Sequence, residues 1–312
     1  MKKLLMLCYY FPPLGMGGVQ RPAKFAKYLA DFGWQPTIVT VKPIAYWAQD
    51  PSLLNELAGV RIERTGSLDP QRLLYKWRKH PTLSATSPQP SGGRARYLFE
   101  KVLPFFFIPD SKVLWRWHAG HRIRQLLRNE TFDALYTTAP PHSVHLFGRR
   151  VAAKFHLPWV ADFRDGWVDG VVVREPTRWH RHRHAALQSA VLRHADAVLA
   201  VSEGIAAALA VPDKTRVLAN GFDPDDFPAV AKKEEGVHIC HCGSITSFSN
   251  PALLFQALRL LARTDPELMK NLRIHYVGMD ATNQFEADIV RHGMERVVTY
   301  HGYQPHRRAL QW

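Results

Sequence analysis

Residues 2–21 read KKLLMLCYYFPPLGMGGVQR, an apolar run that leads into a glycine-rich turn and then into a helix-like stretch. The run Lys3–Cys8 predicts a buried β-strand, and Gln20–Phe32 predicts the helix after it. Glycines let a backbone approach a ligand closely and adopt positive φ, and the unpaired N–H groups of a helix's first turn attract anions. We therefore expect Gly17 and Gly18 to bind the phosphate or the sugar of a substrate. The alternative is that these glycines only permit a tight turn.

Two common nucleotide-binding folds do not fit this opening. Gln20 stands where G-x-G-x-x-G needs its third glycine, and the strand Thr37–Val41 ends in Lys42-Pro43 rather than in the acidic residue that holds a ribose. This pattern disfavours NAD binding. The sequence also lacks the G-x-x-x-x-G-K-[ST] motif of P-loop ATPases and GTPases.

The composition is that of a globular protein with a strong positive charge. At 312 residues and 46% hydrophobic content the chain can form two domains, and its formal net charge is +14. Such a charge suits nucleic acid, an anionic membrane surface or phosphorylated substrates. The sequence has no nucleic-acid-binding motif, so we expect no nucleic-acid partner. Basic residues between Arg72 and Lys101 precede the apolar stretch 102–109, which predicts either membrane docking or a solvated basic face beside a buried loop.

The cysteines and the apolar runs bear on the compartment. Cys8, Cys240 and Cys242 cannot form a disulfide framework, and all lie in runs that predict buried strands. Cys240-His241-Cys242 lacks the second pair of ligands that a zinc site needs, so we interpret these cysteines as packed strand residues and expect no metal. No run approaches the roughly 18 apolar residues of a membrane-spanning helix. We expect a cytoplasmic protein, with a peripheral place at the inner membrane face left open.

Strand-like runs alternate with helix-like stretches along the whole chain, which predicts an α/β fold of two Rossmann-like domains with parallel sheets. The first domain is predicted to span 1–228 and the second to begin at 229, after the turn-rich stretch Asn220–Pro228. The predicted strands are 3–8, 37–41, 60–64, 134–138, 159–161, 197–201, 216–218, 237–242, 272–277 and 297–301. Three strands are about half of an open α/β domain, so we expect the second domain to be incomplete within 229–312.

Short motifs in a fixed order carry a resemblance to a known family. They are the 11–18 turn, Ala139-Pro140-Pro141-His142-Ser143, Ala161-Asp162-Phe163-Arg164-Asp165-Gly166-Trp167, Val201-Ser202-Glu203, Asn220-Gly221-Phe222-Asp223 and Gly243-Ser244-Ile245. Together they resemble the family 4 glycosyltransferases of the GT-B type along nearly the whole chain. The resemblance implies two Rossmann-like domains that face each other across a cleft. It also implies that the first domain binds the acceptor and that the second binds a nucleotide sugar.

His142 follows the strand 134–138, at the carboxyl end where open α/β sheets bind ligands. The resemblance implies that His142 lies at the sugar-transfer centre, where it contacts the sugar and helps to stabilise the charge of the leaving group. The alternative is a histidine at a helix start whose ring packs or caps.

Asp162, Arg164 and Asp165 also follow a strand, and two interpretations stay open for them. They form either a structural ion-pair network or an acceptor site, with Asp162 and Arg164 binding substrate and Asp165 accepting a hydrogen bond from the attacking hydroxyl. The resemblance implies retention of anomeric configuration, and we assign no nucleophile.

Two further sets of residues matter. His180, His182 and His184 alternate with arginines, which favours a solvated basic helix over a metal pair.

By resemblance, Gly243 and Ser244 form the phosphate turn of the sugar-nucleotide site, and Tyr303 lies where the backbone contacts the nucleobase. The resemblance also leads us to expect a basic residue shortly after the Gly243-Ser244 turn, but Thr246–Asn250 contains none. The acidic segment that would hold the ribose would come after Trp312.

The function that the resemblance implies for these residues is a retaining glycosyltransferase. It would move a sugar from a UDP- or GDP-linked co-substrate, without another cofactor, to a saccharide or lipid-linked acceptor in cell-surface polysaccharide synthesis. The alternative is a non-catalytic sugar- or nucleotide-binding protein or scaffold.

Overall fold

The computed structural model describes residues 1–15, 17–43, 48–70, 72–73, 102–168, 175–227, 235–246, 249, 251–280 and 282–312. They form two compact units, which divide between Phe222 and Asp223, with the described residues 48–52 belonging to the second. The basic residues 76–101 and the predicted loop 83–93 lie outside the described residues.

The first unit contains a parallel sheet. Its strands are β1 (Lys2–Leu7), β2 (Trp34–Val41), β3 (Arg61–Thr65), β4 (Ala134–Ala139), β5 (Trp159–Phe163), β6 (Ala197–Ala200) and β7 (Thr215–Val217). Among the described residues the order is β3-β2-β1-β4-β5-β6-β7, and every pair is parallel. The α/β class predicted from the sequence is confirmed.

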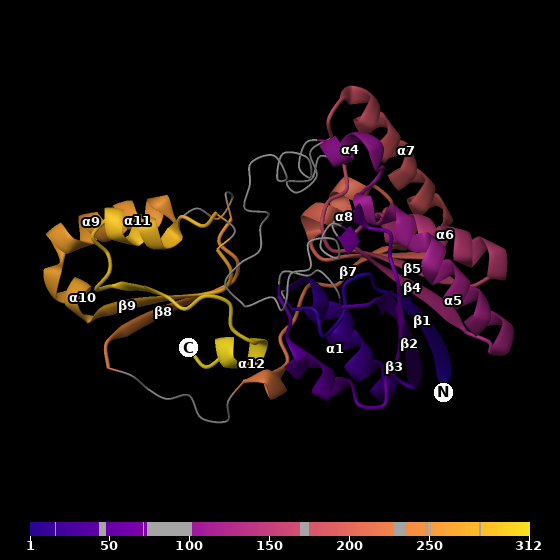
Figure 1. Cartoon of the computed structure of the whole chain (residues 1–312), viewed down its shortest axis with the longest axis horizontal. Helices are drawn as coiled ribbons and strands as arrows, with labels where there is room; N and C mark the ends of the chain where they lie inside the picture. The colour runs from indigo at the N-terminus through magenta and orange to yellow at the C-terminus, as the bar shows by residue number, and fades with distance from the viewer. Residues whose placement is uncertain are drawn as a thin grey trace. The chain divides into compact units, whose positions relative to one another are not determined.

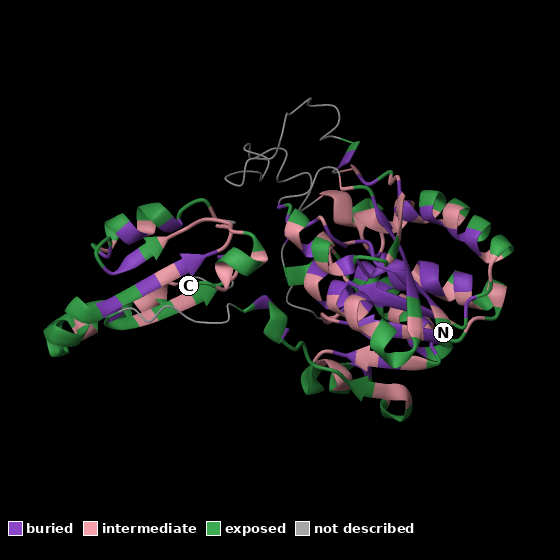
Figure 2. Ribbon diagram, turned by 90° about the horizontal axis from the view of Figure 1, so that it is seen from below, coloured by how far each residue is buried: buried purple, intermediate pink, exposed green. Residues whose placement is uncertain are grey.

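Helices cover both faces of this sheet (Figure 1). They are α1 (Gln20–Tyr28), α5 (Trp115–Asn129), α6 (Ser143–Phe155), α7 (Arg178–His194) and α8 (Glu203–Leu209), while the short α4 (Leu103–Phe106) lies beside α7. Alternate residues of β1 point to opposite faces: Met6 packs with Ala23 of α1, whereas Leu5 packs with Ile123 of α5 and Phe147 of α6. Figure 2 shows the result, a sheet buried along most of its length beneath helices whose outer sides are exposed.

The second unit has a smaller parallel sheet with the order β10-β9-β8 among its described residues. Its elements are β8 (Val237–Cys242), α9 (Ala252–Thr264), α10 (Pro266–Asn271), β9 (Leu272–Val277), α11 (Phe285–Arg291), β10 (Val298–Tyr300) and α12 (His306–Ala309). Phe255 of α9 and Phe285 of α11 pack on the face of β9 that presents Ile274 and Tyr276.

The packing of α9 and α11 corrects the interpretation of two cysteines. Cys240 pairs in register with His275, so it lies on the face opposite to Ile274, and Cys242 shares that face. Cys240 is only half-buried and Cys242 is exposed, with their Sγ atoms 3.4 Å apart. The prediction of packed cysteines is therefore right for Cys8, only partly right for the half-buried Cys240, and wrong for Cys242.

No helix in the described ranges is both long enough and apolar enough to span a membrane.

Candidate functional site

The carboxyl ends of β1, β4 and β5 bring together most of the site residues predicted in the first unit. β1 lies between β2 and β4, so the strand order reverses there, and open α/β sheets bind ligands at such a reversal. Gly17 and Gly18 follow β1, His142 follows β4, and Asp165 follows β5. Figure 1 shows these strands side by side.

The glycine turn after β1 is a tight one. Gly17 and Gly18 form a 3₁₀ turn with Val19 that runs directly into α1, and neither has positive φ. Both are exposed, and no described atom lies within 4 Å of the place where a Cβ on Gly17 would be. The turn does not use the freedom of glycine to adopt positive φ, while the open space beside the backbone fits close approach by a ligand.

Arg164 ties the turn after β1 to the loop after β4. Its Nη1 donates to the Gly18 carbonyl, its Nη2 donates to the Pro140 carbonyl at 2.9 Å, and its Nε donates to the Ala139 carbonyl at 3.1 Å. These bonds use much of the hydrogen-bonding capacity of the guanidinium on the backbone. In this structure Arg164 holds two loops of the site in a fixed relation.

Asp162 is enclosed and its carboxylate is fully bonded. Its side chain is 0% exposed and forms a two-pronged ion pair with Arg21, whose Nη2 and Nε lie 2.9 and 3.0 Å from the two carboxylate oxygens. The hydroxyls of Tyr136 and Thr138 donate to it at 2.6 and 2.9 Å. For Asp162 the structure favours the structural ion-pair network over contact with a substrate.

His142 lies below the surface. Its residue is 3% exposed and its ring stacks on Trp167, with centroids 4.8 Å apart and planes at 5°. Burial, helped by the nearby His145, His184 and Arg164, holds the pKa of His142 well below its usual value, so the ring is neutral at pH 7. The ring packs, as in the alternative left open by the sequence, yet its buried Nδ1 has no hydrogen-bond partner among the described residues.

Trp167 and His184 extend this cluster, and the sequence analysis assigned neither of them to the site. The indole N–H of Trp167 donates to Nδ1 of His184 at 3.1 Å. His180 and His184 are buried at 6% and 3% exposure, so the prediction of a solvated helix is wrong for these two histidines. They begin a stripe along α7 that continues through Leu187 and Val191. The spacing of these residues by three or four positions is typical of the buried face of a helix, so it could have predicted their burial.

Asp165 is half-buried beside Arg164. Burial raises its pKa, against the opposing effect of the Arg164 charge. A carboxylate with a raised pKa at the ligand-binding edge of a sheet has the properties of a proton acceptor.

Asp110 was also missed, although it fixes the start of α6 directly after His142. Its carboxylate accepts hydrogen bonds from the backbone N–H and the hydroxyl of Ser143, at 2.9 and 2.7 Å, and from the backbone N–H of Lys112. Burial raises the pKa of Asp110, against the effect of its bonds to Ser143. A carboxylate that caps a helix from a distant loop leaves no local signature in the sequence.

In the second unit, three glycines join the turns at the carboxyl ends of β8, β9 and β10. The Gly243 N–H donates to the Val277 carbonyl, and the Gly278 N–H donates to the Gly302 carbonyl, each at 2.9 Å. Gly278 has φ of +156°, and a Cβ there would lie 1.9 Å from the Gly243 oxygen. The structure thus places Gly243, Ser244 and Tyr303 on turns at one edge of the small sheet.

Asp280 orders the turn after β9, and the sequence analysis missed it. It accepts backbone hydrogen bonds from Thr282, Gln284 and Phe285 at 2.8 to 2.9 Å. Burial opposes ionisation, but the bond donated by the Thr282 hydroxyl at 2.6 Å, together with these backbone bonds, outweighs it and lowers the pKa of Asp280.

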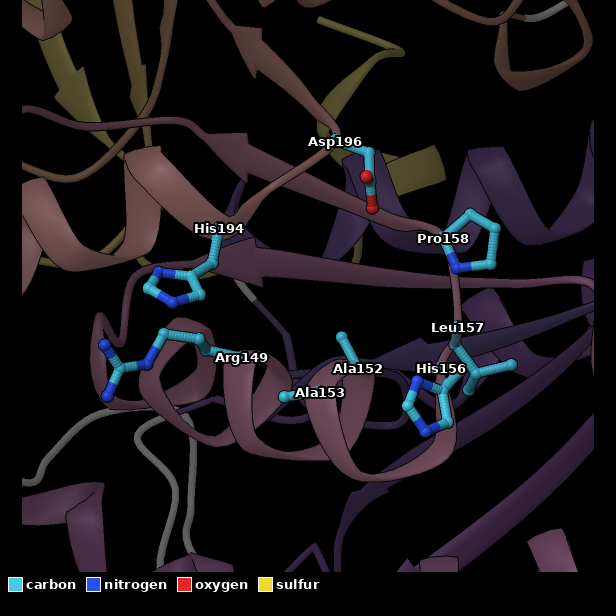
Figure 3. A pocket seen from close by; sticks show the side chains of 8 residues that line it. All are labelled: Arg149, Ala152, Ala153, His156, Leu157, Pro158, His194 and Asp196. Atoms are coloured by element: carbon cyan, nitrogen blue, oxygen red, sulfur yellow. The ribbon is translucent and has the colours of Figure 1, made fainter.

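A surface pocket lies at the opposite end of the larger sheet (Figure 3). It is lined by Arg149, Ala152, Ala153, His156, Leu157, Pro158, His194 and Asp196. Pro158 and Asp196 directly precede β5 and β6, so the pocket is at the amino ends of the strands. Open α/β sheets bind ligands at the carboxyl ends, and we do not place the site in this pocket.

Comparison with known proteins identifies the family. The model of the glycosyl transferase 4-like domain matches residues 17–221. No curated protein sequence matches the chain.

Solved structures resemble the fold at low sequence identity. HepE from Anabaena, in complex with UDP, is 15% identical with a TM-score of 0.57, covering 99% of this chain and 71% of HepE. Sucrose-phosphate synthase from Thermosynechococcus elongatus is 15% identical with a TM-score of 0.59, covering 100% and 73%. WaaG, a glycosyltransferase of lipopolysaccharide biosynthesis, is 16% identical with a TM-score of 0.52, covering 98% and 72%. The chain therefore belongs to the family 4 glycosyltransferases and has their GT-B fold.

Proposed function

We propose that the protein transfers a sugar, with retention of configuration, from a UDP- or GDP-linked co-substrate to a saccharide or lipid-linked acceptor in cell-surface polysaccharide synthesis. The observation that carries this proposal is the joining of the Gly243, Gly278 and Gly302 turns at one edge of the small sheet. These turns are partly exposed, and backbone without side chains suits a diphosphate. HepE, which shares the fold, was crystallised with UDP and with UDP-glucose.

Each unit has its own task in this proposal. Gly243, Ser244 and Tyr303 bind the nucleotide sugar, and Gly17 and Gly18 approach the acceptor. Arg164 holds the acceptor loops in place. No metal or further cofactor is needed for these roles. The reaction takes place in the cytoplasm, at the inner membrane face when the acceptor carries a lipid.

His142 and Asp165 supply the chemistry. The neutral His142 ring offers an unsatisfied Nδ1, and a buried polar atom without a partner is costly, so a substrate hydroxyl that reaches it gains a hydrogen bond. Asp165 accepts a hydrogen bond from the attacking acceptor hydroxyl.

Release of nucleotide tests the proposal. The purified chain, incubated with a set of UDP- and GDP-sugars and saccharide acceptors, should release UDP or GDP, and calorimetry should show that the same nucleotide binds. Binding without turnover would instead support the non-catalytic sugar- or nucleotide-binding protein. Absence of binding to every nucleotide sugar would contradict both functions.

The pH profile tests Asp165. Because burial raises its pKa, the carboxylate takes up a proton above the usual aspartate range, and kcat/KM should fall as the pH drops through that raised value. Asp165→Asn should lower kcat by about 100-fold or more and should remove this acidic limb. The exposed Asp213→Asn is the control and should change neither. An unchanged profile in Asp165→Asn would exclude the proposed role.

A further inference from the structure

We propose that the protein docks on an anionic lipid bilayer through one exposed surface, which α4 and the first turns of α7 form together. This α4–α7 patch consists of Phe105, Phe106, Arg178, Trp179, Arg181 and Arg183. The inference deepens the proposed function and rests on it, since docking would bring the protein to a lipid-linked acceptor.

The aromatic side chains of the patch are exposed and adjacent. Phe106 is 76% exposed, Trp179 59% and Phe105 48%. Phe105 and Trp179 both contact the ring of His180, with centroids 5.3 and 4.9 Å away. Figure 1 shows α4 beside α7. A group of large aromatic residues in water is unfavourable unless another surface covers it.

The charge around these aromatic side chains selects the partner. The sequence of α7, Arg178–His194, contains no Asp or Glu, and Arg178, Arg181 and Arg183 are exposed. The Arg183 guanidinium lies 6.0 Å from the Trp179 ring centroid. Tryptophan and phenylalanine beside arginines are the composition of surfaces that enter the headgroup region of anionic membranes. The exposed phenylalanines favour a bilayer over nucleic acid, since they gain by leaving water.

His180 fixes α4 to α7. Its Nδ1 lies 2.8 Å from the Thr177 hydroxyl, and its Nε2 lies 3.3 Å from the Phe105 carbonyl. A neutral ring can accept from the hydroxyl and donate to the carbonyl at the same time. The patch is therefore held as one surface.

The buried side of the same helix reaches the candidate site. One turn after His180, His184 accepts from Trp167, and Trp167 stacks on His142. Docking through the outer side of α7 would thus place the ligand-binding edge of the first unit near the membrane, where a lipid-anchored acceptor is held.

Vesicle sedimentation tests the patch without any nucleotide sugar. The full chain should bind vesicles of phosphatidylglycerol and phosphatidylcholine, and should bind phosphatidylcholine alone at least tenfold more weakly. Phe106→Ser combined with Trp179→Ser should weaken binding to the mixed vesicles at least tenfold. Arg178→Gln, Arg181→Gln and Arg183→Gln together should abolish the preference for the anionic lipid.

Matched controls come from elsewhere in the first unit. Phe32→Ser removes a phenylalanine of similar exposure, 77%, and Arg193→Gln removes an exposed arginine at the other end of α7. Both should bind vesicles as the unaltered chain does. The proposal is overturned if the unaltered chain does not bind vesicles, if the controls weaken binding as much as the patch variants, or if RNA binds in preference to vesicles. Loss of the proposed function appears separately, as vesicle binding without release of nucleotide.

Discussion

Asp162→Asn is expected to destabilise the first unit by about 3–5 kcal/mol, because it leaves the buried Arg21 guanidinium without its counter-charge. An amide also cannot accept all the bonds that now come from Arg21, Tyr136 and Thr138. The cost of an unpaired buried charge far exceeds the value of an exposed ion pair. Urea unfolding followed by tryptophan fluorescence measures the loss.

Lys3→Gln is the matched control for this prediction. It breaks the Lys3–Glu130 ion pair in the same unit, where the lysine side chain is 39% exposed, and should cost no more than about 1 kcal/mol. Equal losses in the two variants would show that Asp162 is not the enclosed, fully bonded carboxylate described above.

Gly278→Ala is expected to abolish tight binding of the nucleotide sugar. The new Cβ would lie 1.9 Å from the Gly243 oxygen, at a φ of +156° that other residues rarely adopt. Relief of the clash must displace the turn after β8, which carries Gly243 and Ser244. Backbone strain of about 3 kcal/mol corresponds to a Kd raised by about 100-fold. Calorimetric titration with the nucleotide that the unaltered chain binds gives this value.

Gly293→Ala separates the clash from the general cost of replacing a left-handed glycine. Gly293 has φ of +65°, and no described atom lies within 4 Å of its added Cβ. This variant should lose about 1–2 kcal/mol of stability and keep the Kd of the unaltered chain. A Gly278→Ala chain that binds the nucleotide as tightly as Gly293→Ala would refute the assignment of these turns to the nucleotide sugar.

The sheets could be predicted from the sequence because each parallel strand is a short apolar run between helix-like stretches. Every predicted strand overlaps an observed one, from β1 to β10. His142, Arg164 and Asp165 could be named before their surroundings were known, because each follows a predicted strand and stands in a motif that carries the family resemblance.

The environment of these residues could not be predicted, because it depends on partners far away in the chain. Asp162 is paired with Arg21, which precedes it by 141 residues, so the choice between a structural and a binding role needed the fold. The burial of His184 was different, since the stripe through Leu187 and Val191 was readable in the sequence. The arginines that alternate with the histidines of α7 had instead favoured the prediction of a solvated helix.

The bonds of Arg164 to Gly18 and Pro140 have a mechanical consequence. One planar, rigid group links segments that are more than a hundred residues apart in the chain, so a displacement of either loop must be transmitted to the other. A sugar that presses on the first loop would thereby shift the backbone that precedes His142. The two loops are therefore expected to move together when a ligand binds. Their backbone amide resonances should then show correlated changes in an NMR titration.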